Sequence, residues 1–277
     1  MASPVRLMAA AYPVGMDPGS VAPAVSRHLP VVACAGVPIV ACTPEEASEE
    51  VIRLSLEPKQ VGVHVHLCNA YTLALADTDA SLRAVLTDSG LNFPDGKSVV
   101  WANRLTHRGM GLPSDRVYGP DLMLDVIRDG QAVGLRHFLL GSTDDVLTDL
   151  EEALLARFPE AQVVGSWSPP FRKLTHWERR EQAACLDDSG ADVVWVGLGT
   201  PNQDIEVELL ATEVPAVHIA IGAAFDFISG HKQQAPAWAG RAGLEWVYRW
   251  AREPRRLTRR YAWGNLAFVK AVWRTRQ

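Results

Sequence analysis

The chain has 277 residues, of which 48% are hydrophobic and 21% charged, and its formal net charge is −5. This composition is typical of a globular protein with a substantial core and excludes an intrinsically disordered chain. No run of eighteen apolar residues occurs, and the first residues form an apolar stretch broken by prolines. We therefore expect neither a transmembrane helix nor a signal peptide.

Four cysteines, Cys34, Cys42, Cys68 and Cys185, show no C-x-x-C pair and no nearby histidine at ligand spacing. They are predicted to be buried thiols of a reducing cytoplasm in preference to a zinc site.

The N-terminal part begins with residues 1–29, which are rich in proline and glycine and are expected to form a loose arm. Residues 31–41 are apolar around a central glycine and predict a hairpin. Thr43 and Glu46 then have the spacing of a capping box, which predicts a helix over 44–56.

Strand-like apolar runs alternate with helical segments along the rest of the chain. The expected strands are 61–67, 137–141, 161–166, 192–198 and 216–222. The expected helices are 69–77, 80–89, 120–129, 144–158, 177–189 and 202–210. Such alternation predicts a mostly parallel sheet with helices on both faces, a Rossmann-like α/β core over 30–240.

Ligands of such folds bind at the carboxyl ends of the strands. The residues expected there are Asn69, Asp95, Gly141, Gly199 and Gly222.

Two of these side chains have structural explanations as well as functional ones. Asp95 stands in a Pro-Asp-Gly turn, where an aspartate commonly stabilises the turn itself. Asn69 fits a helix cap and a ligand-holding amide equally well. The segment 197–203 ends a buried strand and starts a helix through Pro201, and the N-terminus of such a helix is a natural anion-binding site. Residues 222–230 are expected to form a strand end and a loop.

Three further motifs resemble binding sites but lack a required part. Residues 90–98 imitate a phosphate loop, with one residue too many between the glycines and Pro94 inside the loop. Asp77 and Asp79 form the D-x-D of metal-dependent sugar transferases, but they lie between two helical segments, where acidic caps are common. The glycine pair at 197–199 lacks the third glycine of the dinucleotide fingerprint.

The C-terminal residues 241–277 carry nine arginines and one lysine against two glutamates, a net of +8. Apolar residues recur in this segment at helical spacing, and Pro254 predicts two short helices there. Either a docked helix with a solvated face or a surface for phosphate or anionic lipid would explain the pattern. Because the buried strands all precede residue 241, the body is expected to fold without this appendage.

The chain resembles the WecG/TagA/CpsF family of bacterial glycosyltransferases from about residue 30 to 268. The matching pieces are Asn69-Ala70, Pro94-Asp95-Gly96, Gly119-Pro120-Asp121, Leu139-Leu140-Gly141, Gly197-Leu198-Gly199 with Pro201 and Gln203, Gly222-Ala223 with Phe225-Asp226-Phe227 and Gly230, Ala235-Pro236, and the run from Gly243 to Tyr261.

The resemblance implies an inverting, metal-independent hexosyltransferase that moves a sugar from a UDP-sugar to a polyprenyl-diphosphate-linked saccharide. It implies that Asp95 is the general base and that Asn69 contacts the sugar or the transition state. The substrate-binding residues that it implies are Gly141, Gly199, Pro201, Gln203, Gly222, Asp226, Arg249, Arg256, Arg259 and Arg260. It implies no metal and no cofactor.

The implied partners are the two substrates and an anionic membrane surface, at the inner face of the cell membrane, in surface polysaccharide or wall polymer synthesis. Nucleic acid is not expected, and a homo-oligomer stays open. The sequence departs from the family pattern at Leu67, Cys68, Asn202, Asp204 and Gln234, which puts the donor sugar in question. A retuned or degenerate nucleotide-sugar-binding protein and a dinucleotide-binding oxidoreductase are the alternatives.

Overall fold

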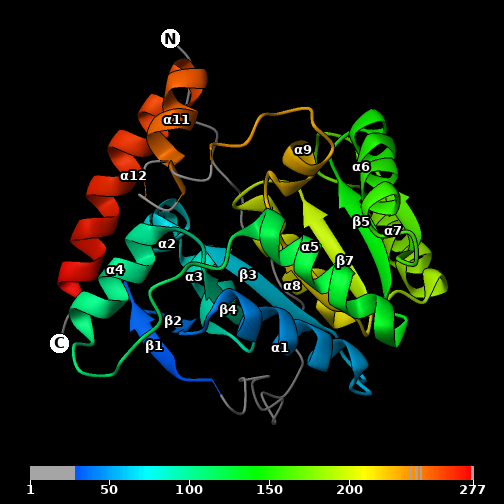
Figure 1. Cartoon of the computed structure of the whole chain (residues 1–277), viewed down its shortest axis with the longest axis horizontal. Coiled ribbons are helices and arrows are strands. Elements are labelled where there is room, and N and C mark those ends of the chain that lie inside the picture. The colour runs from blue at the N-terminus through cyan, green and yellow to red at the C-terminus, as the bar shows by residue number, and fades with distance from the viewer. Residues whose placement is uncertain (1–28, 237–238, 241–242, 244, 276–277) are drawn as a thin grey trace.

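The computed structural model describes residues 29–236, 239–240, 243 and 245–275. The expected arm over 1–29 therefore lies almost wholly outside the described residues. Within them, the chain forms a six-stranded sheet, a separate two-stranded hairpin and a set of surrounding helices (Figure 1).

The six-stranded sheet is parallel throughout and confirms the predicted Rossmann-like α/β fold. Its strand order is β4-β3-β8-β7-β5-β6. The strands are β3 (Val63–Cys68), β4 (Leu91–Pro94), β5 (Arg136–Gly141), β6 (Gln162–Trp167), β7 (Val193–Gly197) and β8 (Val217–Ala220). The carboxyl ends of β4, β3 and β8 consequently lie side by side.

Helices cover both faces of the sheet because alternate strand residues point to opposite sides. Val193 and Trp195 of β7 join a cluster with α1 (Pro44–Leu56), α5 (Gly119–Gly130) and α6 (Asp144–Arg157). On the other face, Val194 and Val196 pack with α7 (His176–Ser189) and α8 (Asn202–Glu213). Helix α3 (Ala80–Thr87) contacts α8 on that side.

The expected hairpin and capping box are both present. Strands β1 (Val31–Cys34) and β2 (Val37–Val40) pair antiparallel around Gly36. The Glu46 amide donates to Thr43 Oγ1 at 3.2 Å, and the Thr43 amide donates to Glu46 Oε2 at 2.8 Å. Helix α1 therefore starts where the sequence predicts.

Two elements beside Asp95 are absent from the sequence prediction. Strand β4 has four residues, with a buried asparagine and a terminal proline, and these give a weak strand pattern. The Asn92 side chain is accommodated because its Nδ2 donates to the carbonyls of Pro38 and Leu86. Helix α4 (Lys97–Thr106) follows, and α9 (Ala224–Ile228) forms where a loop was expected.

The C-terminal appendage consists of α11 (Glu245–Arg252) and α12 (Pro254–Arg274). The break at Pro254 is confirmed, but α12 is a 21-residue helix and not a short one. It lies along α2 (Ala70–Ala76) and beside α4 (Figure 1). Phe268 and Ala271 of α12 are buried in a cluster that includes Leu73 of α2.

Gly264 of α12 lies against Tyr71 of α2, where the two helices pack closely. A Cβ atom at this position would stand 3.1 Å from the Tyr71 ring, so a larger residue would require the ring to shift and glycine favours the close approach of the two helices. One residue earlier, the Trp263 ring meets the Tyr71 ring edge to face, with centroids 6.2 Å apart. None of the helices in the described residues is long and apolar enough to cross a membrane.

Candidate active site

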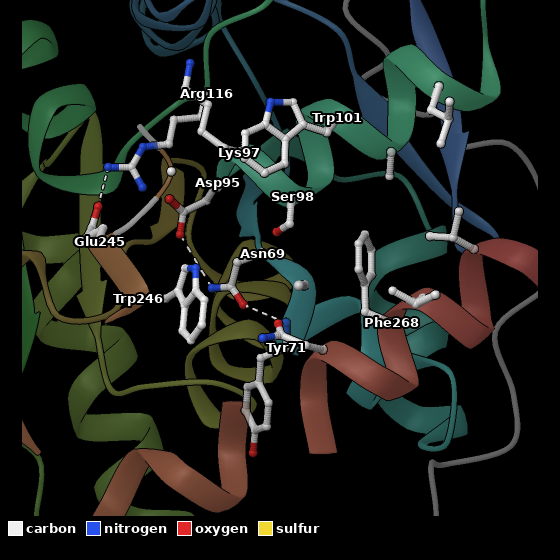
Figure 2. A pocket seen from close by; sticks show the side chains of 18 of the residues that line it. Asn69, Tyr71, Asp95, Lys97, Ser98, Trp101, Arg116, Glu245, Trp246 and Phe268 are labelled. Atoms are coloured by element: carbon white, nitrogen blue, oxygen red, sulfur yellow. Dashed lines mark hydrogen bonds and ion pairs between the residues drawn. The ribbon is translucent and has the colours of Figure 1, made fainter. Parts of the chain in front are cut away.

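A cavity of about 510 Å³ opens between the carboxyl ends of β3 and β4 and the helices α4, α11 and α12. Figure 2 shows Asn69, Asp95, Arg116 and Glu245 grouped on one side of it, with Phe268 on the other side. The cavity thus has a polar wall at the strand ends and a more apolar wall between α4 and α12.

Asn69 follows β3 and performs both roles that its sequence position allows. Its Oδ1 accepts from the amides of Tyr71 and Thr72, at 3.0 and 3.2 Å, and so caps α2. Its Nδ2 donates to Asp95 Oδ2 at 3.5 Å. The cap fixes which end of the side-chain amide faces the cavity, and that end is the hydrogen-bond donor.

Asp95 lies at the end of β4, where its amide donates to the Cys68 carbonyl of β3 at 2.9 Å. Gly96 follows with φ of 124°, a conformation that L side chains rarely adopt, and it turns the chain into α4. Burial raises the pKa of Asp95 to about 6, an effect that the positive charge of Arg116 opposes. A carboxyl group with this pKa is mostly ionised near neutral pH and can accept a proton.

Three residues that were not among the predicted site residues surround Asp95. Arg116, from the loop between α4 and α5, forms an ion pair with Glu245 of α11. Its guanidinium also lies over the Tyr118 ring, 4.2 Å from the ring centroid. Arg116 and Glu245 are 129 residues apart, so local spacing carries no signal of their contact.

Arg249 is one helical turn after Glu245 on α11, and it lines the same cavity. Its guanidinium is 5.4 Å from the centroid of the Phe227 ring in α9. Its positive charge also lowers the pKa of Asp95. Arg249 therefore lies between the cavity and the segment that follows β8.

The apolar wall comes from α4 and α12 and continues to the protein surface. Its main side chains are Trp101, Leu105, Phe268, Val269, Val272 and Trp273. Phe268 is buried, whereas Trp273 is 73% exposed at the outer end. A polar ligand alone would leave this half of the cavity without complementary contacts.

A second group of expected residues meets at the carboxyl ends of β7 and β8. Gly199 donates its amide to Gln203 Oε1 at 2.8 Å. A Cβ atom at Gly222 would stand 3.7 Å from Gln203 Nε2. Pro201 is the N-cap residue of α8. The structure thus brings Gly199, Pro201, Gln203 and Gly222 together, but none of them lines the cavity.

Gly141 and Asp226 have other local roles. A Cβ atom at Gly141 would stand 2.7 Å from the Gly197 carbonyl oxygen, so this glycine allows β5 and β7 to end side by side. Asp226 forms an ion pair with Lys232 at 2.6 Å. Neither residue lines the cavity. Arg256, Arg259 and Arg260 lie on α12, and their side chains are outside the described part of the structure.

Both aspartates of the D-x-D motif have structural partners. Asp79 caps α3, since its Oδ1 accepts from the amides of Ser81 and Leu82. Asp77 forms ion pairs with Arg83 and with Arg274 of α12, which ties the end of the appendage to the body. Of the cysteines, Cys34, Cys42 and Cys68 are buried free thiols as predicted, whereas Cys185 is half-buried.

The departures from the family pattern lie in two different environments. Leu67 and Cys68 are buried in the sheet, and Asn202 and Gln234 are exposed. Asp204 is buried, and its Oδ1 lies 3.2 Å from His66 Nδ1.

Comparison with known protein families gives a match that spans residues 32–277. The matching family is described as the glycosyl transferase WecG/TagA/CpsF family. The chain belongs to this family. The resemblance noted from the sequence is thereby confirmed over the strand ends, the cavity and the appendage. Membership makes the protein a glycosyltransferase by family and favours a transferase over the oxidoreductase considered from sequence.

Proposed function

We propose that the protein is an inverting, metal-independent glycosyltransferase that transfers a sugar from a UDP-sugar to a polyprenyl-diphosphate-linked saccharide. The observation that carries this proposal is the placement of Asp95, which stands at the cavity wall with a pKa raised to about 6. The proposed pathway context is the synthesis of a cell-surface polysaccharide or wall polymer.

Asp95 acts as the general base in a single displacement. Its carboxylate accepts the proton of the acceptor hydroxyl while that oxygen forms a bond to the anomeric carbon. The bond between the anomeric carbon and the phosphate oxygen breaks, and its electron pair leaves with UDP. Attack from the face opposite the leaving group inverts the anomeric centre. The Asn69 amide donor, held by the cap of α2, binds a sugar hydroxyl or steadies the Asp95 carboxylate.

Positive charge is needed where the UDP diphosphate departs. Arg249 lies between the cavity and α9, and Arg116 lies beside Asp95. Arg256, Arg259 and Arg260 add to this charge in the sequence of the appendage. Because Asp77 and Asp79 are engaged in ion pairs and a helix cap, the arginines are the better candidates for balancing the leaving-group charge.

In this proposal the two substrates bind to different parts of the site. The turn of Gly199 and Gln203, at a helix N-terminus next to Gly222, suits the anionic donor. The apolar wall between α4 and α12 suits the hydrocarbon of the acceptor, because a UDP-sugar offers no apolar surface of that extent.

The outer side of α12 is the proposed contact with an anionic membrane. Trp263, Leu266 and Trp273 are exposed apolar side chains of this helix, and Leu266 is 68% exposed. Lys270 and Arg274 lie on the same helix. Exposed tryptophans with interspersed cations are typical of helices that lie in a membrane interface.

The experiment that tests this function measures UDP released from a panel of UDP-sugars, with and without a lipid-diphosphate saccharide acceptor. The expected result is acceptor-dependent release with one donor and a product of inverted anomeric configuration. Release that does not depend on any acceptor, or a product with retained configuration, would contradict the proposal. Activity that persists in EDTA would support metal independence, and loss of activity restored by a divalent cation would refute it.

A further inference from the structure

A chain of buried polar side chains runs between β3 and α8, away from the cavity. His64 and His66 alternate with apolar residues along β3, so both point to the face that α8 covers. His64 Nδ1 lies 2.8 Å from His66 Nε2, and His66 Nδ1 lies 3.2 Å from Asp204 Oδ1. None of the three residues is more than 4% exposed.

The geometry allows a continuous set of hydrogen bonds. Burial lowers the pKa of His64 to about 3, with a further effect of His66 and His218, so its ring is neutral. His66 donates from Nδ1 to the Asp204 carboxylate, and its Nε2 shares one hydrogen with His64 Nδ1. Gly90 leaves the room for this arrangement, since a Cβ atom there would stand 2.3 Å from His64 Nδ1.

Burying such a chain of polar side chains costs free energy that apolar side chains in the same core would not cost. Asp204 Oδ2 has no hydrogen-bond partner within the described residues, although it is buried. A buried carboxylate with one oxygen unsatisfied is generally less favourable than a well-packed apolar side chain. The positive end of α8 offsets part of this cost, because Asp204 lies in the first helical turn. The arrangement therefore calls for a role other than stability.

The first turn of α8 carries the group at the ends of β7 and β8. Gln203 directly precedes Asp204, and its Oε1 accepts the Gly199 amide at 2.8 Å. Strand β3, which supplies His66, ends at Cys68, directly before Asn69. The bond between Asp204 and His66 thus fixes the start of α8 to the strand that leads into the cavity.

We propose that Asp204, acting through His66, is a positioning residue that holds the first turn of α8, and with it Gln203 and the Gly199 turn, in the geometry that binds the nucleoside diphosphate of the donor. The identity of the ligand in this inference rests on the proposed function. The role of Asp204 in holding the first turn of α8 does not depend on that function.

The chain offers a matched control on the same helix. Glu206 is also buried, but its Oε1 accepts from Gln182 of α7 at 2.7 Å and its Oε2 from Arg179 at 3.3 Å. Glu206→Gln therefore disturbs a buried carboxylate of α8 that faces away from β3. Asp204→Asn keeps an oxygen that accepts from His66, whereas Asp204→Ala removes it.

The first measurement is amide hydrogen exchange of the segment 197–203 in the full chain without ligand. Asp204→Ala is expected to speed exchange in this segment about tenfold, the effect of one lost buried hydrogen bond, whereas Asp204→Asn and Glu206→Gln change it less than about threefold. His66→Phe removes the hydrogen-bond partner of Asp204 and is expected to speed exchange in this segment as much as Asp204→Ala does. If Asp204→Ala fails to fold, His66→Phe still tests the inference.

The second measurement is the dissociation constant of UDP for the same variants. It is expected to rise about tenfold for Asp204→Ala and His66→Phe and to stay within about twofold for the other two. Unchanged exchange and unchanged UDP affinity in Asp204→Ala, or an equal effect of Glu206→Gln, would overturn the inference. Failure of the wild-type protein to bind UDP would contradict the proposed function instead, and the exchange result would still decide the positioning role.

Discussion

The side-chain amide of Asn69 connects the start of α2 to the carboxylate of Asp95. Its oxygen accepts two backbone amides of the helix, and its nitrogen lies 3.5 Å from Asp95 Oδ2. Because both ends of the amide are engaged, the residue cannot flip without losing the cap. The orientation of the proposed base is therefore linked to the folding of α2 against α12.

Replacing Asn69 with aspartate tests this link. Asn69→Asp keeps the cap, since aspartate and asparagine cap helices equally well, but it places a second negative charge beside Asp95. The like charge is expected to raise the pKa of Asp95 and to move the acid limb of kcat/KM upward by about one pH unit or more. Asn69→Ser, which also caps, is the matched control: it loses only the hydrogen bond that lowers the pKa of Asp95 and should move the limb upward by less than Asn69→Asp does. An unmoved limb in Asn69→Asp would contradict the contact.

The pH dependence of the wild-type enzyme follows from the raised pKa of Asp95. A general base works only when it is deprotonated, so kcat/KM should rise with pH through about 6 and level off above it. A pH–rate profile with the preferred donor measures this directly. A profile that stays flat down to pH 4.5 would assign the proton transfer to another group.

Replacing either partner of the Arg116–Glu245 ion pair is expected to shift the acid limb of kcat/KM, in opposite directions for the two residues. Arg116 lowers the pKa of Asp95 and Glu245 raises it. Arg116→Gln should therefore shift the acid limb to higher pH, and Glu245→Gln should shift it to lower pH. Each change leaves one charged partner unpaired, so thermal unfolding of both variants must be recorded beside the profiles. Shifts in the same direction would refute the electrostatic account.

Much of the fold could be predicted because its signals are local. Apolar runs of five to seven residues marked the strands, and Thr43 with Glu46 marked the start of α1. Strand β4 was missed because the polar Asn92 is satisfied by the carbonyl of nearby Leu86 and by that of Pro38, which is distant in the sequence. Helix α4, which follows it, was missed as well.

The candidate site could be predicted only in part, for a related reason. Asn69 and Asp95 follow strands, and the alignment of parallel strand ends brings them together. Arg116 and Glu245 meet across 129 residues, and His66 and Asp204 across 138, so no spacing in the sequence points to either pair. Tertiary packing of the appendage decides the first pair, and packing of α8 on the sheet decides the second.

The apolar wall of the cavity predicts a dependence on acceptor chain length. Val269→Gln on α12 should raise the KM for a long-chain lipid-diphosphate acceptor several-fold and leave the KM for a short-chain analogue nearly unchanged. Trp177→Ala, at an exposed apolar residue of α7, is the control and should change neither. Point changes are preferable to deletion of 241–277, because deletion also removes Phe268 and Ala271 from a buried cluster. Equal effects on both acceptors would contradict the assignment of this wall to the hydrocarbon.

The central claim is that Asp95 is the base. Its most direct test measures the rate at which the Asp95→Asn variant releases UDP during turnover, together with the UDP affinity and the thermal unfolding of the same variant. Turnover should fall by about 10²–10⁴-fold while UDP binds as in the wild type. The raised pKa of Asp95 means that the folded protein holds this proton more tightly than the unfolded chain. Stability from this group is therefore full below pH 3.8 and lost as pH rises through about 6. Asp95→Asn should accordingly unfold at a higher temperature than the wild type at pH 8. Wild-type turnover in a folded Asp95→Asn protein would contradict the account.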